Sequence, residues 1–351
     1  RPNWSMVCST GWPMFIVRLN SATLPPALGK MADRDGEFDL IADLFAPLSG
    51  EGALNLTDDA AVLPPTPGRQ MVIAKDAMVE GVHYLPGTSP DLIARKLMRT
   101  NLSDLAAMGA EPAGYLLAMF RDKAMSQNWL QGFAAGLKQD QRTFGLSLLG
   151  GDSVSTPGPG AFSLTILGEI EPGTAVLRSG ARAGDLIYVT GTIGDAGLGL
   201  QILQDKLVVT NPDDRSFLIS RHQLPEPRLE AGRALRAIAT AAIDVSDGLI
   251  SDIGHIAEAS GLAGEIDISR LPRSAAAIAT GAELLTLATS GDDYELAFCA
   301  PADKTPEIES LASLVGLQIT CIGKMTSGHG IQVFDETGSK IDCDNTGWRH
   351  Y

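Results

Sequence analysis

Aspartates stand in six short motifs of a kind that binds hard cations. Each motif follows or interrupts an apolar run, so we expect most of these aspartates where a strand ends and a loop or helix begins. Ligand groups made only of oxygen suit Mg2+, which commonly joins a protein to phosphates. The motifs therefore predict phosphate chemistry. Their aspartates are Asp58, Asp59, Asp76, Asp104, Asp152, Asp244, Asp247, Asp292 and Asp293.

The segment 244–248 has more oxygen atoms than a helix cap needs. Asp244, Ser246 and Asp247 place three oxygen ligands within four residues. A single Asp or Ser before a helix is ordinarily an N-cap. For any one of these residues alone, an N-cap is therefore favoured over a ligand role. The three together favour a cation or phosphate site.

Gly150 and Gly151 precede Asp152 at the end of a predicted strand. Glycines at this place let the backbone approach a phosphate, and Asp152 would hold a bridging metal. A plain turn uses the same residue types, so this motif alone leaves both interpretations open.

The commonest nucleotide-binding loops do not occur in the chain. The P-loop pattern GxxxxGK[ST] is absent. The segment 191–199, GTIGDAGLG, follows a predicted strand, but its glycines do not satisfy GxGxxG. We therefore interpret this segment as a backbone turn in preference to a cofactor loop.

Three single residues are weaker candidates. His83 follows Asp76 in a loop and suits a substrate phosphate, although an isolated histidine is ordinarily a surface or core residue. Arg178 suits nucleotide phosphates or an interdomain salt bridge equally well. Trp348 is consistent with stacking on a planar ring or with simple packing.

Composition narrows the class of protein. The 351 residues are 44% hydrophobic, enough for a full core, and at this length two domains are expected. The formal net charge of −15 argues against a nucleic-acid surface, which needs basic patches. No apolar run approaches the roughly 18 residues that span a bilayer. The widely spaced cysteines favour reduced thiols in a cytoplasmic protein; they are Cys8, Cys299, Cys321 and Cys343.

Alternating strands and helices predict an α/β (α+β) fold. Residues 1–30 are interpreted as a disordered or spurious extension, because Met31 begins a more natural opening. The first domain, 31–170, is expected to hold helices at 36–48, 90–109 and 126–141 and strands at 71–74, 115–120, 145–150 and 162–170. The second domain, 171–351, begins in a Gly- and Pro-rich junction. Its expected strands are 185–190, 241–245, 265–269, 294–300, 317–323 and 330–334, with helices after 191–199 and within 226–240, 248–260, 274–289 and 305–315.

In this order the motifs resemble those of the thiamine-monophosphate kinases. This family belongs to the PurM-like (aminoimidazole ribonucleotide synthetase) superfamily of ATP-binding proteins. NLSDLAAMG and GGD are shared across the superfamily, whereas DVSDGL with GDDYEL and the terminal GW select the kinase. The resemblance covers residues 36–351.

The resemblance implies a two-domain PurM-like fold whose N-terminal mixed sheet forms a homodimer. It implies that ATP phosphorylates thiamine monophosphate with several Mg2+ ions, in the last step of thiamine diphosphate biosynthesis. Carried over by motif, the magnesium ligands are Asp59, Asp76, Asp104, Asp152, Asp244 and Asp247. The ATP contacts are Gly151, Asp152, Arg178 and Ser246, and the substrate contacts are His83, Asp292 and Trp348. Asp58 and Asp293 then become flanking structural residues.

The chain departs from the family pattern at three places. Thr57 replaces the usual glycine before the Asp pair, and Asp292 replaces a residue that is often Glu. Ala74 and Lys75 replace the usual Ser/Thr pair before Asp76. If these two bind metal, they do so through backbone carbonyls; otherwise one metal is lost and Lys75 supplies the charge.

A phosphate acceptor needs no general base, because its second pKa of about 6 leaves it largely ionised at pH 7. We therefore expect catalysis by positioning and electrostatics, with direct in-line transfer from ATP. One alternative is another ATP-using member of the superfamily, a selenophosphate synthetase or a hydrogenase-maturation protein. A second is a non-catalytic protein that binds metal or nucleotide.

Overall fold

The computed structural model describes residues 40–343 and 347. The N-terminal extension and Trp348 therefore lie outside the described residues. Two sheets organise the described part of the chain. A four-stranded sheet is built from residues 70–170, and a seven-stranded sheet is built from residues 186–341.

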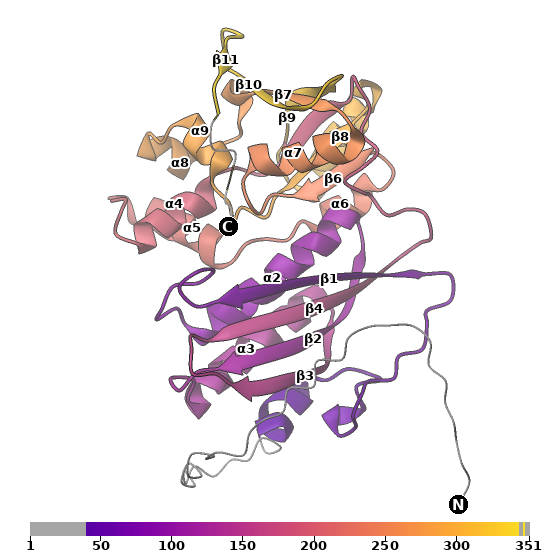
Figure 1. The fold of residues 1–351 in the computed structure, drawn as a ribbon, viewed down its shortest axis with the longest axis vertical. Helices are drawn as coiled ribbons and strands as arrows, with labels where there is room; N and C mark the ends of the chain where they lie inside the picture. The colour runs from indigo at the N-terminus through magenta and orange to yellow at the C-terminus, as the bar shows by residue number, and fades with distance from the viewer. Residues whose placement is uncertain (1–39, 344–346, 348–351) are drawn as a thin grey trace, which may run out of the picture. The chain divides into compact units, whose positions relative to one another are not determined.

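The four-stranded sheet has the order β1-β4-β2-β3 (Figure 1). Its strands are β1 (Gln70–Val79), β2 (Glu111–Arg121), β3 (Ser147–Ser155) and β4 (Ala161–Ile170). β2 and β3 are parallel, and the other pairs are antiparallel. Helices α2 (Pro90–Met108) and α3 (Gln127–Phe144) cover one face and share its apolar core, which includes Leu97, Phe133, Phe162 and Leu164.

The other face of this sheet carries exposed apolar side chains. Alternate residues of a strand point to opposite faces, and the exposed set of every strand lies away from the helices. On this uncovered face Met71 and Ile73 of β1 are 54% and 61% exposed, and Leu116, Phe120 and Val154 are also exposed. A sheet face of this composition is suited to burial against another surface.

The seven-stranded sheet has the order β11-β10-β7-β9-β5-β8-β6. Among the described strands of this sheet, β10 and β7 form the one parallel pair. The strands are β5 (Leu186–Thr190), β6 (Ala241–Asp244), β7 (Ala263–Asp267), β8 (Leu296–Ala300), β9 (Ile319–Thr326), β10 (Gly330–Phe334) and β11 (Lys340–Ile341). The helices are α4 (Asp195–Leu203), α5 (Pro212–Gln223), α6 (Leu229–Leu235), α7 (Leu249–Ser260), α8 (Ala275–Thr280), α9 (Leu284–Thr289) and α10 (Thr305–Val315).

Helix α2 packs against elements of both sheets. Its N-terminal part belongs to the core of the four-stranded sheet, whereas Ala106 near its end packs with Tyr188, Leu235 and Phe298. The contact with α6 requires glycine, since a Cβ at Gly232 would lie 1.9 Å from the Ala106 carbonyl oxygen. A residue on α2 can therefore face groups from either sheet.

Several local expectations were wrong. The predicted helix 36–48 is a π-helical turn, Ile41–Phe45, followed by the 3-10 turn Ala46–Leu48. The predicted helix within 226–240 is only α6, and α5 was not predicted. Its start carries a capping signal, because the Asn211 side chain accepts from the Asp213 and Asp214 amides and Pro212 follows it.

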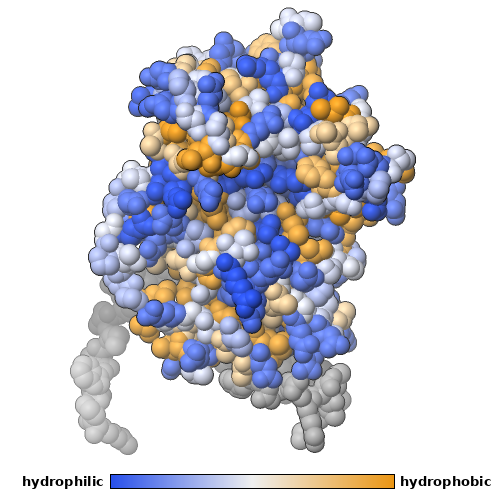
Figure 2. Space-filling model, turned by 180° about the vertical axis from the view of Figure 1, so that it is seen from behind, coloured by the Kyte–Doolittle hydropathy of each residue, from blue (hydrophilic) through white to orange (hydrophobic). Residues whose placement is uncertain are grey.

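Two further predictions concern surfaces and cysteines. No helix in the described ranges is long and apolar enough to cross a bilayer. On the face seen in Figure 2, hydrophobic and hydrophilic residues are intermixed, and hydrophilic residues gather across the middle. Cys299 and Cys321 are free thiols, as predicted, and Cys8 lies outside the described residues.

Candidate active site

One side of α2 faces a row of carboxylates. Lys96, Thr100 and Ser103 follow one another at helical spacing and so share a face. The Lys96 ammonium pairs with Asp292, and Thr100 and Ser103 lie beside Asp76 and Asp244, where each opposes the increase that burial causes in the pKa of its neighbouring carboxyl. Asp104 lies beside this face.

Asp76 lies in the middle of β1, on the helix-covered face. Its backbone amide donates to Asn101 Oδ1 at 3.0 Å, and Asn101 Nδ2 donates to the Leu97 carbonyl at 2.8 Å. Asn101 is fully buried and fixes the strand to the helix at this point. Burial raises the pKa of the Asp76 carboxyl, and the charge of Asp247 adds to the increase.

The pKa values of both Asp104 and Asp244 are raised. Burial is the main cause of the raised pKa of Asp104, followed by the charges of Asp244 and Asp76. Burial also raises the pKa of Asp244, again with a contribution from Asp76. The charge of Arg178 acts in the opposite direction on both carboxyls. Three aspartates from β1, α2 and β6 therefore form one negatively charged region.

The loop between β6 and α7 brings Asp247 to the same region. The amides of Ser246, Asp247 and Gly248 donate to Asp252 Oδ2 at 3.0, 3.2 and 3.2 Å. Burial raises the pKa of Asp252 to about 8, and the charges of Asp244 and Asp247 contribute. Asp252 was not singled out in the sequence, although it lies one turn into a predicted helix and shapes this loop.

The loop before β8 docks on the β6–α7 loop. The Asp292 amide donates to the Ser246 carbonyl and the Tyr294 amide to the Val245 carbonyl, both at 2.8 Å. Gly291 is required here, because a Cβ would lie 2.3 Å from the Ser246 carbonyl oxygen. Burial raises the pKa of Tyr294, and the charges of Asp292, Asp76, Asp244 and Asp104 raise it further. The phenol thus lies among the carboxylates.

Asp292 is held by two residues that the sequence analysis missed. Its Oδ2 lies 2.9 Å from Lys96 Nζ and 3.3 Å from His222 Nδ1. Burial alone would raise the pKa of Asp292, but the Lys96 and His222 contacts more than offset it and hold the pKa below its usual value. The only sequence signal for Lys96 is a charge within the apolar face of the predicted helix. His222 lies in the unpredicted α5.

His83 and Arg178 lie close to this region. His83 Nδ1 accepts from the Val79 amide at 3.1 Å, and the His83 carbonyl accepts from Lys96 Nζ at 3.3 Å. Arg178 is exposed in the connection between the two sheets, near enough for its charge to affect Asp104 and Asp244. Four predicted metal ligands, together with His83, Arg178, Ser246 and Asp292, are therefore brought together.

Asp152 lies elsewhere in the single chain. Asp76 pairs with Leu164, Leu164 with Leu117, and Leu117 with Gly151. Directly opposed residues share a face, so Asp152, one residue on, lies on the uncovered face. Three strand spacings separate β3 from β1, roughly 14 Å.

Asp59 and Lys75 also lie apart from the carboxylate row. Asp59 is exposed in the bend 58–60, and within residues 40–343 no hydrogen bond or ion pair links it to the other candidate ligands. Lys75 Nζ donates to Thr165 Oγ1 at 3.2 Å on the uncovered face, so its charge does not replace a metal beside Asp76. The expectation that most aspartates follow strand ends was wrong for Asp76, Asp104 and Asp152, which lie inside β1, α2 and β3.

The donor set fits Mg2+ held jointly with phosphates. No three Asp, Glu, His or Cys side chains of the described residues converge closely enough to hold a metal by themselves. Mg2+ commonly takes one or two carboxylates and completes its shell with water and substrate phosphates. Asp76, Asp104, Asp244 and Asp247 supply oxygen ligands only, and the raised pKa values of Asp76, Asp104 and Asp244 mark a site that favours cations.

Residues 191–194 of the glycine-rich segment form a turn, and residues 195–199 belong to α4. Gly194 begins α4 with φ 91°, and Cβ atoms at Gly191 and Gly199 would lie 2.2 Å from Glu295 Oε1 and 2.1 Å from the Leu218 carbonyl oxygen. These glycines allow close packing of α4, α5 and β8.

Comparison with known proteins identifies the two halves of the chain. Residues 57–170 match the model of the AIR synthase related protein, N-terminal domain, and residues 182–336 match that of the C-terminal domain. A thiamine-monophosphate kinase of Caulobacter vibrioides is 42% identical over 323 residues, covering 90% of each chain.

Solved structures agree with this result. Thiamine-monophosphate kinase from Stenotrophomonas maltophilia K279a matches with a TM-score of 0.74 at 39% identity, covering 79% of this chain and 89% of that one. AaThiL complexed with AMPPCP and TMP matches with a TM-score of 0.72 at 27% identity, covering 90% and 97%. Escherichia coli HypE, a hydrogenase maturation protein, has a TM-score of 0.74 at 20% identity and so shares the fold. The chain belongs to the thiamine-monophosphate kinase family.

Proposed function

We propose that this chain transfers the γ-phosphoryl group of ATP directly to thiamine monophosphate, giving thiamine diphosphate and ADP. A terminal phosphate oxygen of the acceptor attacks the γ-phosphorus, and the bond to the β,γ-bridging oxygen of ATP breaks. The observation that carries the proposal is the meeting of Asp76, Asp104, Asp244 and Asp247 beside residues from both sheets. The related AaThiL, complexed with AMPPCP and TMP, supports the choice of substrates.

The four carboxylates would hold Mg2+. When bound there, Mg2+ would neutralise the charges that keep two phosphorylated substrates apart. Asn101 fixes the backbone of Asp76, and Asp252 fixes the loop that carries Asp247, so the protein holds these ligands in place before substrates arrive. The acceptor is already an anion, which explains why no general base is proposed.

The remaining sequence candidates bind the two substrates in this proposal. Arg178, exposed beside Asp104 and Asp244, and Ser246, in the β6–α7 loop, would contact ATP. His83 and Asp292 would contact thiamine monophosphate. Trp348, outside the described residues, keeps its sequence-based role as a third substrate contact. We also propose that the two domains divide between residues 170 and 171.

Gly151 and Asp152 require a second chain in this account. They stand on the strand farthest from β1, and Asp152 shares the uncovered face with Phe120 and Val154. We infer that two copies pack through this face, as a homodimer, and that Asp152 of one copy serves a site whose other carboxylates belong to its partner. The exposed apolar side chains of this face support the inference.

Mixing two inactive variants tests that arrangement. If Asp152 and Asp104 of one site come from different chains, refolding Asp152→Asn with Asp104→Asn restores about a quarter of wild-type activity, because half of the dimers contain one intact site. If both residues belong to the same chain, the mixture stays inactive. A monomer in analytical ultracentrifugation would reject the dimer itself.

An assay of the wild-type chain with thiamine monophosphate, ATP and Mg2+ tests the function. Thiamine diphosphate and ADP are expected in equal amounts. Turnover of ATP only with selenide, or only with a carbamoylated cysteine peptide, would instead indicate the selenophosphate synthetase or hydrogenase-maturation reaction. Nucleotide binding without any turnover would indicate a non-catalytic protein. Inversion at a chiral γ-phosphorus is expected for direct transfer, and retention would indicate a phosphoenzyme.

A further inference from the structure

Lys96 contacts both of the described segments that we propose to bind thiamine monophosphate. Its Nζ donates to Asp292 Oδ2 at 2.9 Å and to the His83 carbonyl at 3.3 Å. Asp292 belongs to the loop before β8, and His83 follows β1 of the other sheet. One ammonium group therefore contacts both segments at once.

The neighbouring basic residues of α2 do not share this task. Arg95 Nε and Arg99 Nε pair with Asp140 of α3, at 3.1 and 2.7 Å. Asp140 is fully buried, so these pairs fasten α2 to α3 within one core. Lys96 is also buried, with 4% exposure, but its side chain leaves that core and ends at Asp292.

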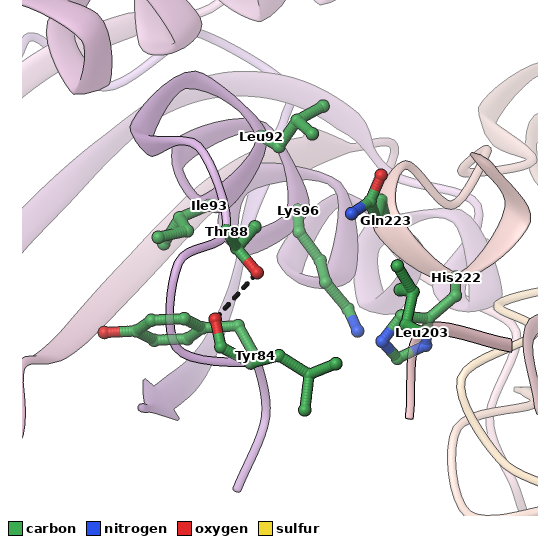
Figure 3. Close-up of a pocket in the computed structure, with 9 residues that line it drawn as sticks. Tyr84, Thr88, Leu92, Ile93, Lys96, Leu203, His222 and Gln223 are labelled. Atoms are coloured by element: carbon green, nitrogen blue, oxygen red, sulfur yellow. Dashed lines mark hydrogen bonds between the residues drawn. The ribbon is translucent and has the colours of Figure 1, made fainter. Parts of the chain in front are cut away.

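His222 completes the surroundings of the Lys96 ammonium. In Figure 3 the Lys96 amine and the His222 ring point toward one another across the pocket that Tyr84 and Leu203 help to line. Burial, followed by the charge of Lys96, lowers the pKa of His222, so the ring is neutral at pH 7. Its Nδ1 lies 3.3 Å from Asp292 Oδ2 without the alignment of a hydrogen bond. Lys96 is therefore the cation that fixes this carboxylate.

The carboxylate of Asp292 keeps one oxygen for a ligand. Both Lys96 and His222 contact Oδ2, and the side chain remains 32% exposed. The backbone at Asp292 has φ 69°, which is held by the hydrogen bond of its amide to Ser246. With the backbone and Oδ2 both fixed, the direction of Oδ1 is determined.

We propose that Lys96 is a positioning residue for the acceptor substrate: it orients Asp292 Oδ1 and holds the His83 segment at the distance that the substrate requires. The proposal rests on the proposed function, since it takes Asp292 and His83 as the residues that contact thiamine monophosphate. It adds Lys96 to the site as a residue that acts through them.

The test compares Lys96→Met with Lys96→Arg and with the exposed control Lys304→Met. Lys304 also pairs with a carboxylate, Glu307, at 2.8 Å, but lies on the surface. Lys96→Met should raise the KM for thiamine monophosphate by about tenfold or more, because the half-buried Asp292 carboxylate loses its charged partner. The KM for ATP should change by less than about threefold, and Lys96→Arg should recover part of the loss. Lys304→Met should match the wild type.

A double-mutant cycle separates positioning from general stability. If Lys96 acts through Asp292, adding Lys96→Met to Asp292→Asn should change the KM by less than about threefold. Multiplied losses, or equal increases in both KM values, would overturn the proposal. A wild-type chain that does not phosphorylate thiamine monophosphate would reject the proposed function and this inference with it. An active wild type whose Lys96→Met variant keeps its KM would reject this inference alone.

Discussion

Asp292 and Asp293 are adjacent in the chain, but their carboxylates serve different parts of the molecule. Asp292 Oδ2 lies 2.9 Å from Nζ of Lys96, which belongs to helix α2 of the four-stranded-sheet region. Asp293 is fully buried and accepts from the amides of Gly194 and Ala196 at 2.7 and 3.2 Å, at the start of α4. Because Asp292 is assigned to substrate binding and Asp293 to the fold, substitutions of the two residues should have different effects.

Asp293→Ala should destabilise the fold with little change in either KM. The variant leaves two buried amides at the start of α4 without acceptors, which costs about 1–3 kcal/mol each. Denaturant unfolding measures the loss, and steady-state kinetics at a temperature where the variant is folded measures both KM values. Asp303→Ala, at an exposed aspartate, is the control and should unfold like the wild type. Unchanged stability of Asp293→Ala would contradict the assignment.

Asp104→Asn should remove activity without weakening the fold. The change deletes a carboxylate that is buried against Asp244 and Asp76, so repulsion in the folded state falls. We expect turnover to fall by about a thousandfold or more, as when a preorganised electrostatic group is lost. Thermal unfolding without Mg2+ should occur at an equal or higher temperature than in the wild type. A variant that is unfolded, or one that keeps its turnover, would be inconsistent with this role.

Binding of Mg2+ should release protons and strengthen as pH rises. The pKa values of Asp76, Asp104 and Asp244 are raised by burial and by the charges of neighbouring aspartates, so protons compete with the metal. Without Mg2+, the folded chain holds these protons above pH 3.8, where the unfolded carboxyls have lost them. Stability contributed by these groups therefore falls as pH rises from about 4 toward neutral.

Calorimetry in two buffers of different ionisation enthalpy checks the released protons. The difference between the measured enthalpies gives the number of protons released for each Mg2+ bound. The wild type should release protons near pH 6, and Asp104→Asn should release fewer. An affinity for Mg2+ that does not change between pH 5.5 and pH 8 would rule out coupling to these carboxyls.

Glu295 should be far more important for stability than an exposed ion pair of similar length. It is fully buried, and Arg221, Arg228 and Thr190 all donate to it. Glu295→Ala leaves Arg221 buried without its charged partner and should cost about 3–5 kcal/mol. Glu307→Ala breaks the exposed pair with Lys304 and should cost at most about 1 kcal/mol. Equal losses in urea unfolding would contradict this difference.

Residue type and spacing were sufficient to find the acidic motifs and most strands. Asp244 and Asp247 follow a short apolar strand, and their position at its end was predicted from that pattern. Asp76 and Asp152 lie on opposite faces of the sheet because of the register in which β1 and β3 are linked through β4 and β2. Neither sequence motif contains information about this register. Lys96 was missed because its partner is 196 residues away in the chain. His222 was missed because the apolar periodicity of α5 is weak, although its N-cap signal is clear.

Transfer of labelled phosphate tests the central claim most directly. With γ-32P ATP, Mg2+ and thiamine monophosphate, the label should appear in the terminal phosphate of thiamine diphosphate. The amount should equal the ADP formed, and Asp104→Asn should transfer the label more slowly by about a thousandfold or more. Label found only in inorganic phosphate, with thiamine monophosphate unchanged, would contradict the account.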